Sequence, residues 1–199
     1  MDILKEFSND KIIEFNKNNI EKYLGKKHIN IENIEDIFKK IEIEIGEKKE
    51  FPYACIDKNN SYKIIISEDI LETERYKWLN HEMIHVISNN QPTVSEVNVG
   101  GIIIEDKEKN IWIGQYLNEA ITEYINQSII KSKYSNYYDR YIDELKYIIS
   151  IIGEEVILKA YFTNNLYLIV DNLSEKTSNS KDEVLEYINS IDYLYDDEE

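Results

Sequence analysis

Two histidines four residues apart, with a glutamate beside the first, stand inside a long helical pattern. They belong to the run His81-Glu82-Met83-Ile84-His85, within residues 69–89, where apolar residues recur with a helical period. Because residues four apart lie one above the other on a helix, two imidazoles can reach one metal ion from a single rigid face. Apolar residues are expected to pack the other side of this helix into the core, namely Leu79, Met83, Ile84, Val86 and Ile87. The pattern therefore predicts a buried helix that holds two metal ligands in place.

The residue beside the first histidine adds a chemical group to this face. Glu82 lies about 100° further around the helix axis, close enough to contact a water held on such a metal. The chain contains 3 histidines, and two of them stand in this run. The alternative is a helix with two incidental histidines, one of them hydrogen-bonded in the core. The third, His28, falls in an expected N-terminal loop and is interpreted as a surface residue.

A pair of carboxylates begins the next long helix, in the run Asn118-Glu119-Ala120-Ile121-Thr122-Glu123-Tyr124. Glu119 and Glu123 are four residues apart and share a face. Carboxylates on the inner face of an apolar helix are costly unless their charges are met, and a divalent cation with imidazole ligands would meet them. Glu119 would complete the His₂Glu set of catalytic zinc, which leaves one position open for water. Glu123 would accept a hydrogen bond from the far nitrogen of a ligand histidine. The alternative is an ordinary solvent-facing glutamate pair.

The two runs together resemble the gluzincins, the thermolysin-like zinc metallopeptidases, which pair HExxH on one helix with NExx(S/T)(D/E) on the next. The resemblance implies that His81, His85 and Glu119 bind zinc and that Glu82 is the general base. It also implies that Glu123 orients the first histidine. The run LNEAITEY is especially similar to small bacterial enzymes of this kind. Since the chain is too short for the full thermolysin architecture, a minimal catalytic core is implied.

The chain departs from the gluzincin pattern at the residue that stabilises the transition state. The segment between His85 and Glu119 is longer than in thermolysin, and no histidine follows the zinc motif. A tyrosine must supply the missing hydrogen bond to the developing oxyanion, or that role is unfilled. Tyr116 is the candidate, because it lies just before the Glu119 helix, with Tyr161 and Tyr138 as alternatives. Ordinary packing is the competing interpretation for each of these tyrosines.

The remaining patterns predict an α+β chain with one zincin-like domain over residues 1–199. Residues 1–116 should form an α+β part, with a small mixed or antiparallel sheet and the HExxH helix, and residues 117–199 a helical part with the third ligand. The expected helices cover 3–24, with a possible break at Ser8-Asn9-Asp10, and then 33–45, 69–89, 117–133, 137–152, 154–162, 164–173 and 181–194. Alternation over 41–45 makes the end of the second helix ambiguous with a strand. A hairpin is expected from 51–57 and 62–67, and extended segments from 94–104 and 110–116, with a turn at 106–110.

Charge and composition exclude several classes of function. A net charge of −16 argues against a general binder of nucleic-acid backbones, and no apolar run is long enough to span a membrane. The lone Cys55 excludes an intramolecular disulfide and is interpreted as a small buried apolar residue. The N-terminus lacks a secretory signal, so a cytoplasmic product is expected, although a mature secreted form with a new initiator methionine would read the same. The acidic residues of 181–199 are interpreted as a solvated helix and a frayed end.

Zinc-dependent hydrolysis of peptide bonds, of the endopeptidase kind, is the function that these patterns favour. The substrate would be a peptide or protein that adds to a sheet edge near residues 51–57, where Pro52 indicates an edge strand. Gly100, Gly101 and Gly114 either allow a mobile flap or serve ordinary turns. A zinc-containing interaction or regulatory protein is the second interpretation, and an acidic module that binds basic proteins is the third. The oligomeric state stays open.

Overall fold

The computed structural model describes residues 9–46, 53–70, 72–89, 98–106, 111–131 and 138–193. Within these residues the chain forms eight helices and six strands, and it is therefore an α+β protein, as expected. The helices are α1 (Asn9–Lys26), α2 (Ile34–Lys40), α3 (Glu72–Asn89), α4 (Gln115–Ile130), α5 (Asp139–Ile152), α6 (Glu154–Phe162), α7 (Leu166–Thr177) and α8 (Lys181–Ile191). The strands are β1 (Glu42–Gly46), β2 (Ala54–Asp57), β3 (Asn60–Ser67), β4 (Asn98–Gly100), β5 (Ile103–Asp106) and β6 (Ile111–Ile113).

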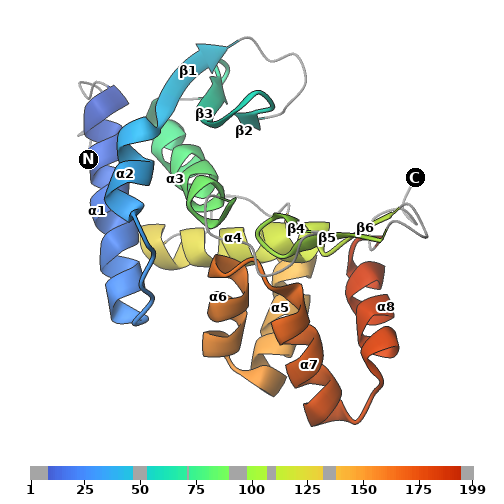
Figure 1. Cartoon of the computed structure of the whole chain (residues 1–199). Helices are drawn as coiled ribbons and strands as arrows, with labels where there is room; N and C mark the ends of the chain where they lie inside the picture. Colours follow the sequence, from blue (N-terminus) through green and yellow to red (C-terminus); the bar gives the residue numbers. More distant parts are fainter. Residues whose placement is uncertain are drawn as a thin grey trace.

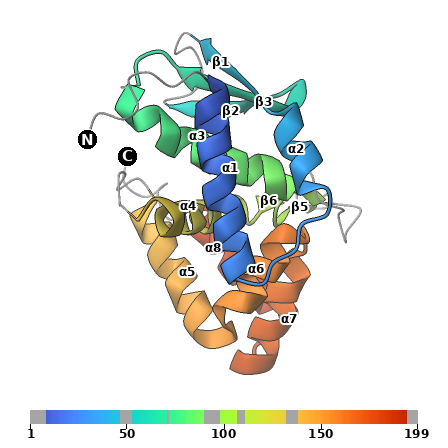
Figure 2. The ribbon, with the colours of Figure 1, turned by 90° about the vertical axis from the view of Figure 1, so that its left-hand side faces the viewer.

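Helices α3 and α4 lie in the middle of the molecule (Figure 1). The sheet of β1, β2 and β3 lies at one end, and the helices α5 to α8 gather at the other (Figure 1 and Figure 2). Helix α1 runs along the side, in contact with both central helices. One cluster of buried apolar residues extends from α1 and β3 through α3 and α4 to α8. The two central helices are thus packed from both sides, which fixes the side chains between them.

The N-terminal sheet is mixed, with the strand order β1-β3-β2. Strand β1 runs parallel to β3, and β2 runs antiparallel to it. The expected hairpin is confirmed as β2 and β3, with a turn in which the Asp57 carboxylate accepts the backbone N–H groups of Asn59 and Asn60. Among the described residues β2 pairs only with β3, so it is an edge strand, as expected. Phe51 and Pro52, which belonged to that prediction, lie outside the described residues.

The helix expected over 33–45 ends early. Helix α2 stops at Lys40, and β1 begins at Glu42. In β1 the residues Ile43 and Ile45 alternate along the strand, and Ile43 pairs with Ile64 of β3. Alternating β-branched residues favour a strand where a partner strand is available, and β3 supplies one. The ambiguity of the sequence pattern is therefore resolved by a pairing distant in the sequence.

A second, antiparallel sheet has the order β4-β5-β6 and lies next to α8 (Figure 1). The prediction of one extended segment over 94–104 is wrong, because a turn separates β4 from β5. At this turn Gly101 adopts φ 56°, a left-handed conformation that glycine accepts without strain. Residues 94–97, and 107–110 of the expected turn, lie outside the described residues.

The helical part follows the predicted order, with ends shifted by a few residues. Helix α4 begins at Gln115 rather than 117, and α7 extends to Thr177 rather than 173. Gly153, at φ 87°, separates α5 from α6. The outer ends of the predictions, residues 3–8, 132–133, 137 and 194, lie outside the described residues. In the part of the chain that is described, no helix combines the length and apolar character needed to cross a membrane.

Candidate metal centre

The candidate ligands come from two helices that pack on each other. Helix α3 carries His81 and His85, and α4 carries Glu119 and Glu123. On both helices the neighbouring apolar residues are buried, as the helical period predicts. They are Leu79, Met83, Ile84, Val86 and Ile87 on α3, and Leu117, Ala120, Ile121 and Ile125 on α4. The polar side chains are therefore held in the contact between two helices whose positions the core fixes.

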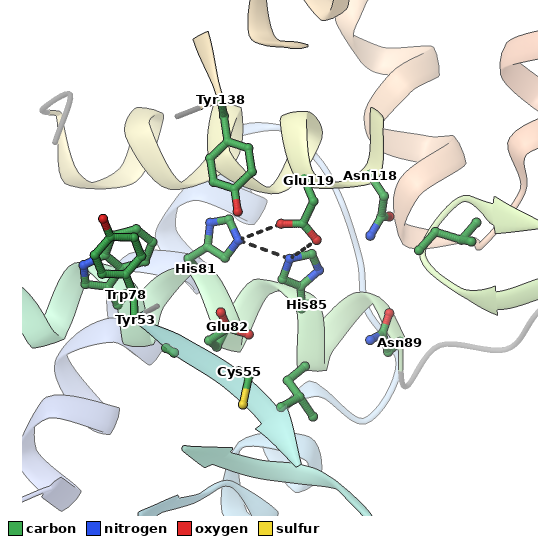
Figure 3. Close-up of a pocket in the computed structure, with 13 residues that line it drawn as sticks. Tyr53, Cys55, Trp78, His81, Glu82, His85, Asn89, Asn118, Glu119 and Tyr138 are labelled. Atoms are coloured by element: carbon green, nitrogen blue, oxygen red, sulfur yellow. Dashed lines mark hydrogen bonds and ion pairs between the residues drawn. The ribbon is translucent and has the colours of Figure 1, made fainter. Parts of the chain in front are cut away.

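Three ligand atoms converge in this contact (Figure 3). His81 Nε2 lies 3.3 Å from one oxygen of Glu119, and His85 Nε2 lies 3.2 Å from the other. The two Nε2 atoms are 3.2 Å apart. All three side chains offer a ligand atom within 4.8 Å of the others, so this group could hold a metal ion. The sequence-predicted ligand set is thus brought together by the fold.

The outer nitrogen of His81 faces Glu123. Its Nδ1 lies 3.1 Å from Glu123 Oε2, and the Glu123 side chain is 1% exposed. Two amides donate to this carboxylate, from Asn126 Nδ2 to Oε2 at 3.2 Å and from Gln127 Nε2 to Oε1 at 2.9 Å. Asn80 on α3 extends this series of hydrogen bonds by donating from Nδ2 to Asn126 Oδ1 at 2.8 Å. The carboxylate that faces His81 is therefore itself fixed by buried hydrogen bonds.

The outer nitrogen of His85 faces a hydroxyl group instead. His85 Nδ1 lies 3.4 Å from Thr122 Oγ1, which lies 2.6 Å from the hydroxyl of Tyr161. The sequence interpretation assigned no role to Thr122 and considered Tyr161 only for the oxyanion. The spacing in the sequence could have indicated this contact, because Thr122 lies one turn from Glu119 on the face that carries the ligands. The contact with Tyr161, 39 residues away, depends on the packing of α6.

A pocket of about 420 Å³ opens beside the three ligands. Its walls come from α3, the start of α4, strand β2 and Tyr138 (Figure 3). Glu82 lines it, on the side of His81 and His85 that faces β2. Cys55 of β2 also lines it and is half-buried, so the prediction of a buried apolar cysteine is wrong.

An aromatic pair forms part of the same wall. The rings of Tyr53 and Trp78 stack with centroids 4.1 Å apart and an interplanar angle of 10°. Trp78 is nearly buried, whereas Tyr53 is 43% exposed. Both residues line the pocket, and the centroid of the Trp78 ring lies 6.5 Å from that of the His81 ring. The pocket therefore combines charged groups at its base with an apolar aromatic face.

The three candidate tyrosines occupy different places. Among the described residues that line the pocket, Tyr138 is present and Tyr116 and Tyr161 are not. The Tyr138 ring stacks on His81 with centroids 5.8 Å apart, and its hydroxyl points towards His81 and Glu119 (Figure 3). The Tyr116 ring stacks on Tyr141 at 4.5 Å, and Tyr161 is buried beneath Thr122. The structure thus brings Tyr138, rather than Tyr116, together with the ligands.

The charges of the cluster shift one another strongly. Burial lowers the pKa of His81, but hydrogen bonds to Glu119 and Glu123 outweigh it and raise the pKa to about 10. Burial raises the pKa of Glu119, yet the neighbouring His85 and His81 outweigh it and hold the pKa well below its ordinary value. Burial raises the pKa of Glu82, and the same imidazoles offset this only in part. Of the two pocket carboxylates, Glu82 therefore binds a proton more readily.

The other residues considered from the sequence lie away from the cluster. His28 is exposed after α1, as expected. Gly101 and Gly114 have φ of 56° and 88°, conformations that suit turns, whereas Gly100 is the last residue of β4. A Cβ at Gly101 would clash with Asn118 Oδ1, so this turn fits closely against the start of α4.

Comparisons of this chain with known proteins give no match to a family model, to a curated protein or to a solved structure. The site is therefore interpreted from its own residues.

Proposed function

We propose that this chain is a zinc-dependent peptidase with a zincin-like core. The observation that carries the proposal is the convergence of His81, His85 and Glu119, whose ligand atoms lie within 4.8 Å of one another at the base of an open pocket. Two imidazoles and one carboxylate are the ligands of catalytic zinc in sites that keep a position for water. An open pocket is what such a site needs to admit a substrate.

The charge of the site supports a divalent cation. Metal-ligating imidazoles must be neutral. With neutral His81 and His85, the carboxylates of Glu82, Glu119 and Glu123 would leave three negative charges in a mostly buried cluster. A divalent cation offsets two of them, whereas uncompensated buried charges are costly.

The chain's own groups would divide the work of hydrolysis. When bound, zinc lowers the pKa of a coordinated water to about 7 and polarises a carbonyl oxygen. Glu82 lines the pocket beside the ligands and would take the proton of that water, then give it to the leaving amine. Tyr138 would donate a hydrogen bond to the developing oxyanion. Strand β2 forms the opposite wall, and an extended peptide would pair with its edge.

The substitution Glu82→Gln tests the proposal, because glutamine keeps the shape of the side chain and cannot accept the proton. We expect the zinc content of the variant to equal that of the wild type and its peptidase activity to fall about 100-fold or more. The zinc content is measured by elemental analysis. Peptidase activity is measured as cleavage of a proteome-derived peptide library. The matched control is Glu35→Gln, an exposed glutamate on α2, which should leave both quantities unchanged.

Two outcomes would contradict the proposal. Full activity of Glu82→Gln would exclude the mechanism. A wild-type protein that holds one zinc ion and cleaves no member of the library would favour a zinc-containing interaction or regulatory protein instead.

A further inference from the structure

The hydroxyl group of Thr122 has all of its hydrogen-bonding capacity in use. It donates its proton to the backbone carbonyl of Asn118, one turn earlier on α4, at 2.9 Å. The same oxygen lies 3.4 Å from His85 Nδ1 and 2.6 Å from the hydroxyl of Tyr161. A threonine hydroxyl offers one donor and two acceptor positions, so with its proton on the Asn118 carbonyl Thr122 can accept from both of these neighbours.

This arrangement suits a His85 that binds a metal. The Nε2 atom of His85 faces Glu119 at 3.2 Å and His81 Nε2 at 3.2 Å, on the side of the candidate ligands. When Nε2 gives its lone pair to a metal, the single N–H group of the neutral ring lies on Nδ1, which faces Thr122. We infer that Thr122 and Tyr161 are positioning residues, which hold the ring of His85 in the orientation that binds a metal through Nε2.

Burial makes this arrangement effective. Thr122 and Tyr161 are 0% exposed and His85 is 7% exposed, so solvent does not compete for these hydrogen bonds. Burial also raises the pKa of Tyr161, despite its hydrogen bonds to Ser88 and Thr122, so the phenol keeps its proton.

The two histidines are therefore held by different means. His81 faces the carboxylate of Glu123, whereas His85 faces a neutral hydroxyl. A second outer carboxylate would add another negative charge to a cluster that already holds three. The hydroxyl pair sets the ring orientation without that added charge. This inference rests on the metal binding proposed above.

Two substitutions of Thr122 separate the hydroxyl from the rest of the side chain. Thr122→Val keeps the branched shape and removes the acceptor, whereas Thr122→Ser keeps the acceptor. We expect the Zn²⁺ affinity of Thr122→Val, measured by competition with a chromophoric chelator, to fall about tenfold or more. Thr122→Ser should stay within about threefold of the wild type. Equal affinity of Thr122→Val and the wild type would overturn the inference.

The hydrogen bond itself can be read by ¹⁵N NMR of the imidazole rings, which is feasible because the chain has 3 histidines. In the zinc-loaded protein we expect the Nδ1–H proton of His85 to exchange slowly with solvent in the wild type and in Thr122→Ser, and faster in Thr122→Val. Equal exchange rates in Thr122→Val and the wild type would contradict the inference. A wild type that binds no Zn²⁺ would instead contradict the proposed function.

The substitution Tyr161→Phe tests the second hydroxyl and does not depend on the folding of Thr122→Val. We expect a smaller loss of Zn²⁺ affinity, and no further loss when Tyr161→Phe is combined with Thr122→Val, because Tyr161 acts through Thr122. The matched control is Tyr23→Phe, since the buried Tyr23 hydroxyl has no hydrogen-bond partner among the described residues. The control should bind Zn²⁺ as the wild type does. Wild-type affinity in Tyr161→Phe, or additive losses in the double variant, would remove Tyr161 from the arrangement.

Discussion

At the scale of single residues, competition between a proton and a cation governs the cluster. His81 lies between Glu119 and Glu123, and both carboxylates favour its protonated form. Both also favour a cation at its Nε2 atom, by the same electrostatic attraction. The carboxylates that favour a metal ion at His81 therefore also raise the affinity of His81 for a proton. Binding of a metal must displace that proton.

We expect zinc affinity to increase with pH. In the metal-free protein the pKa of His81 is about 10, so His81 is protonated at neutral pH and must lose its proton to bind zinc. Raising the pH removes the competing proton, so the apparent affinity should rise from neutral pH upward until the pH reaches that pKa. Isothermal titration calorimetry in buffers of different ionisation enthalpy should detect about one proton released from His81 per zinc ion.

The control for this titration is Glu123→Gln, which removes one of the carboxylates that raise the pKa of His81. Its affinity should be lower, by about 10- to 100-fold, and should depend less on pH in the alkaline range. Zinc binding without proton release in the wild type would show that His81 is not protonated in the metal-free site.

Tyr138 and Tyr116 can be distinguished by removing one hydroxyl from each. We expect Tyr138→Phe to lower kcat by about 100-fold, the usual loss when one oxyanion donor is removed, with zinc content unchanged. Tyr116→Phe should retain wild-type kcat, because the Tyr116 ring stacks on Tyr141 away from the residues that line the pocket. Steady-state kinetics on a cleaved peptide measures both. A loss of kcat in Tyr116→Phe, with wild-type kcat in Tyr138→Phe, would show that Tyr116 donates to the oxyanion.

At the scale of helices, the start of α4 is held by the side chain that follows α8. The Asp192 carboxylate accepts the backbone N–H groups of Gly114, Gln115 and Tyr116, at 2.9, 3.3 and 2.9 Å. Helix α4 has no side-chain cap of its own, because Gly114 occupies the N-cap position. Asp192 thus satisfies N–H groups that are free at the start of a helix. This contact fixes the helix that presents Glu119.

We expect Asp192→Ala to lower the free energy of unfolding by about 1–2 kcal/mol, the usual cost of losing an N-terminal cap. Asp192→Asn keeps one acceptor and should lose less. Urea denaturation measures both. The control is Asp171→Ala, which removes an exposed ion pair with Lys181 and should change stability by about 0.5 kcal/mol or less. Equal effects at the two positions would show that Asp192 does not support α4.

The sequence predicted the helical elements and the ligands for the same reason. Regular apolar periods and spacings of four residues are local signals, so they place His81 with His85 on one helix face and Glu119 with Glu123 on another. The meeting of these two faces depends on the packing of α3 on α4. The contacts of Asp192, Thr122 and Tyr138 depend on tertiary packing, which no local pattern records. The same applies to β1, whose strand conformation depends on pairing with β3.

At the scale of the whole molecule, the candidate site joins the two parts of the chain. Helix α3 packs on the N-terminal sheet, α4 packs on the C-terminal helices, and the ligands lie where α3 and α4 meet (Figure 1). A cation bound to His81, His85 and Glu119 would link these two parts through three side chains. The fold therefore makes the site sensitive to the packing of both parts, and the bound metal would stabilise that packing.

The central claim is that one cation binds between α3 and α4. Anomalous X-ray diffraction at the zinc absorption edge, from crystals grown with zinc, tests it most directly. The account predicts one strong peak within about 2.0–2.2 Å of His81 Nε2, His85 Nε2 and a Glu119 oxygen. Crystals in which these three side chains contact one another, with no anomalous peak between them, would contradict it.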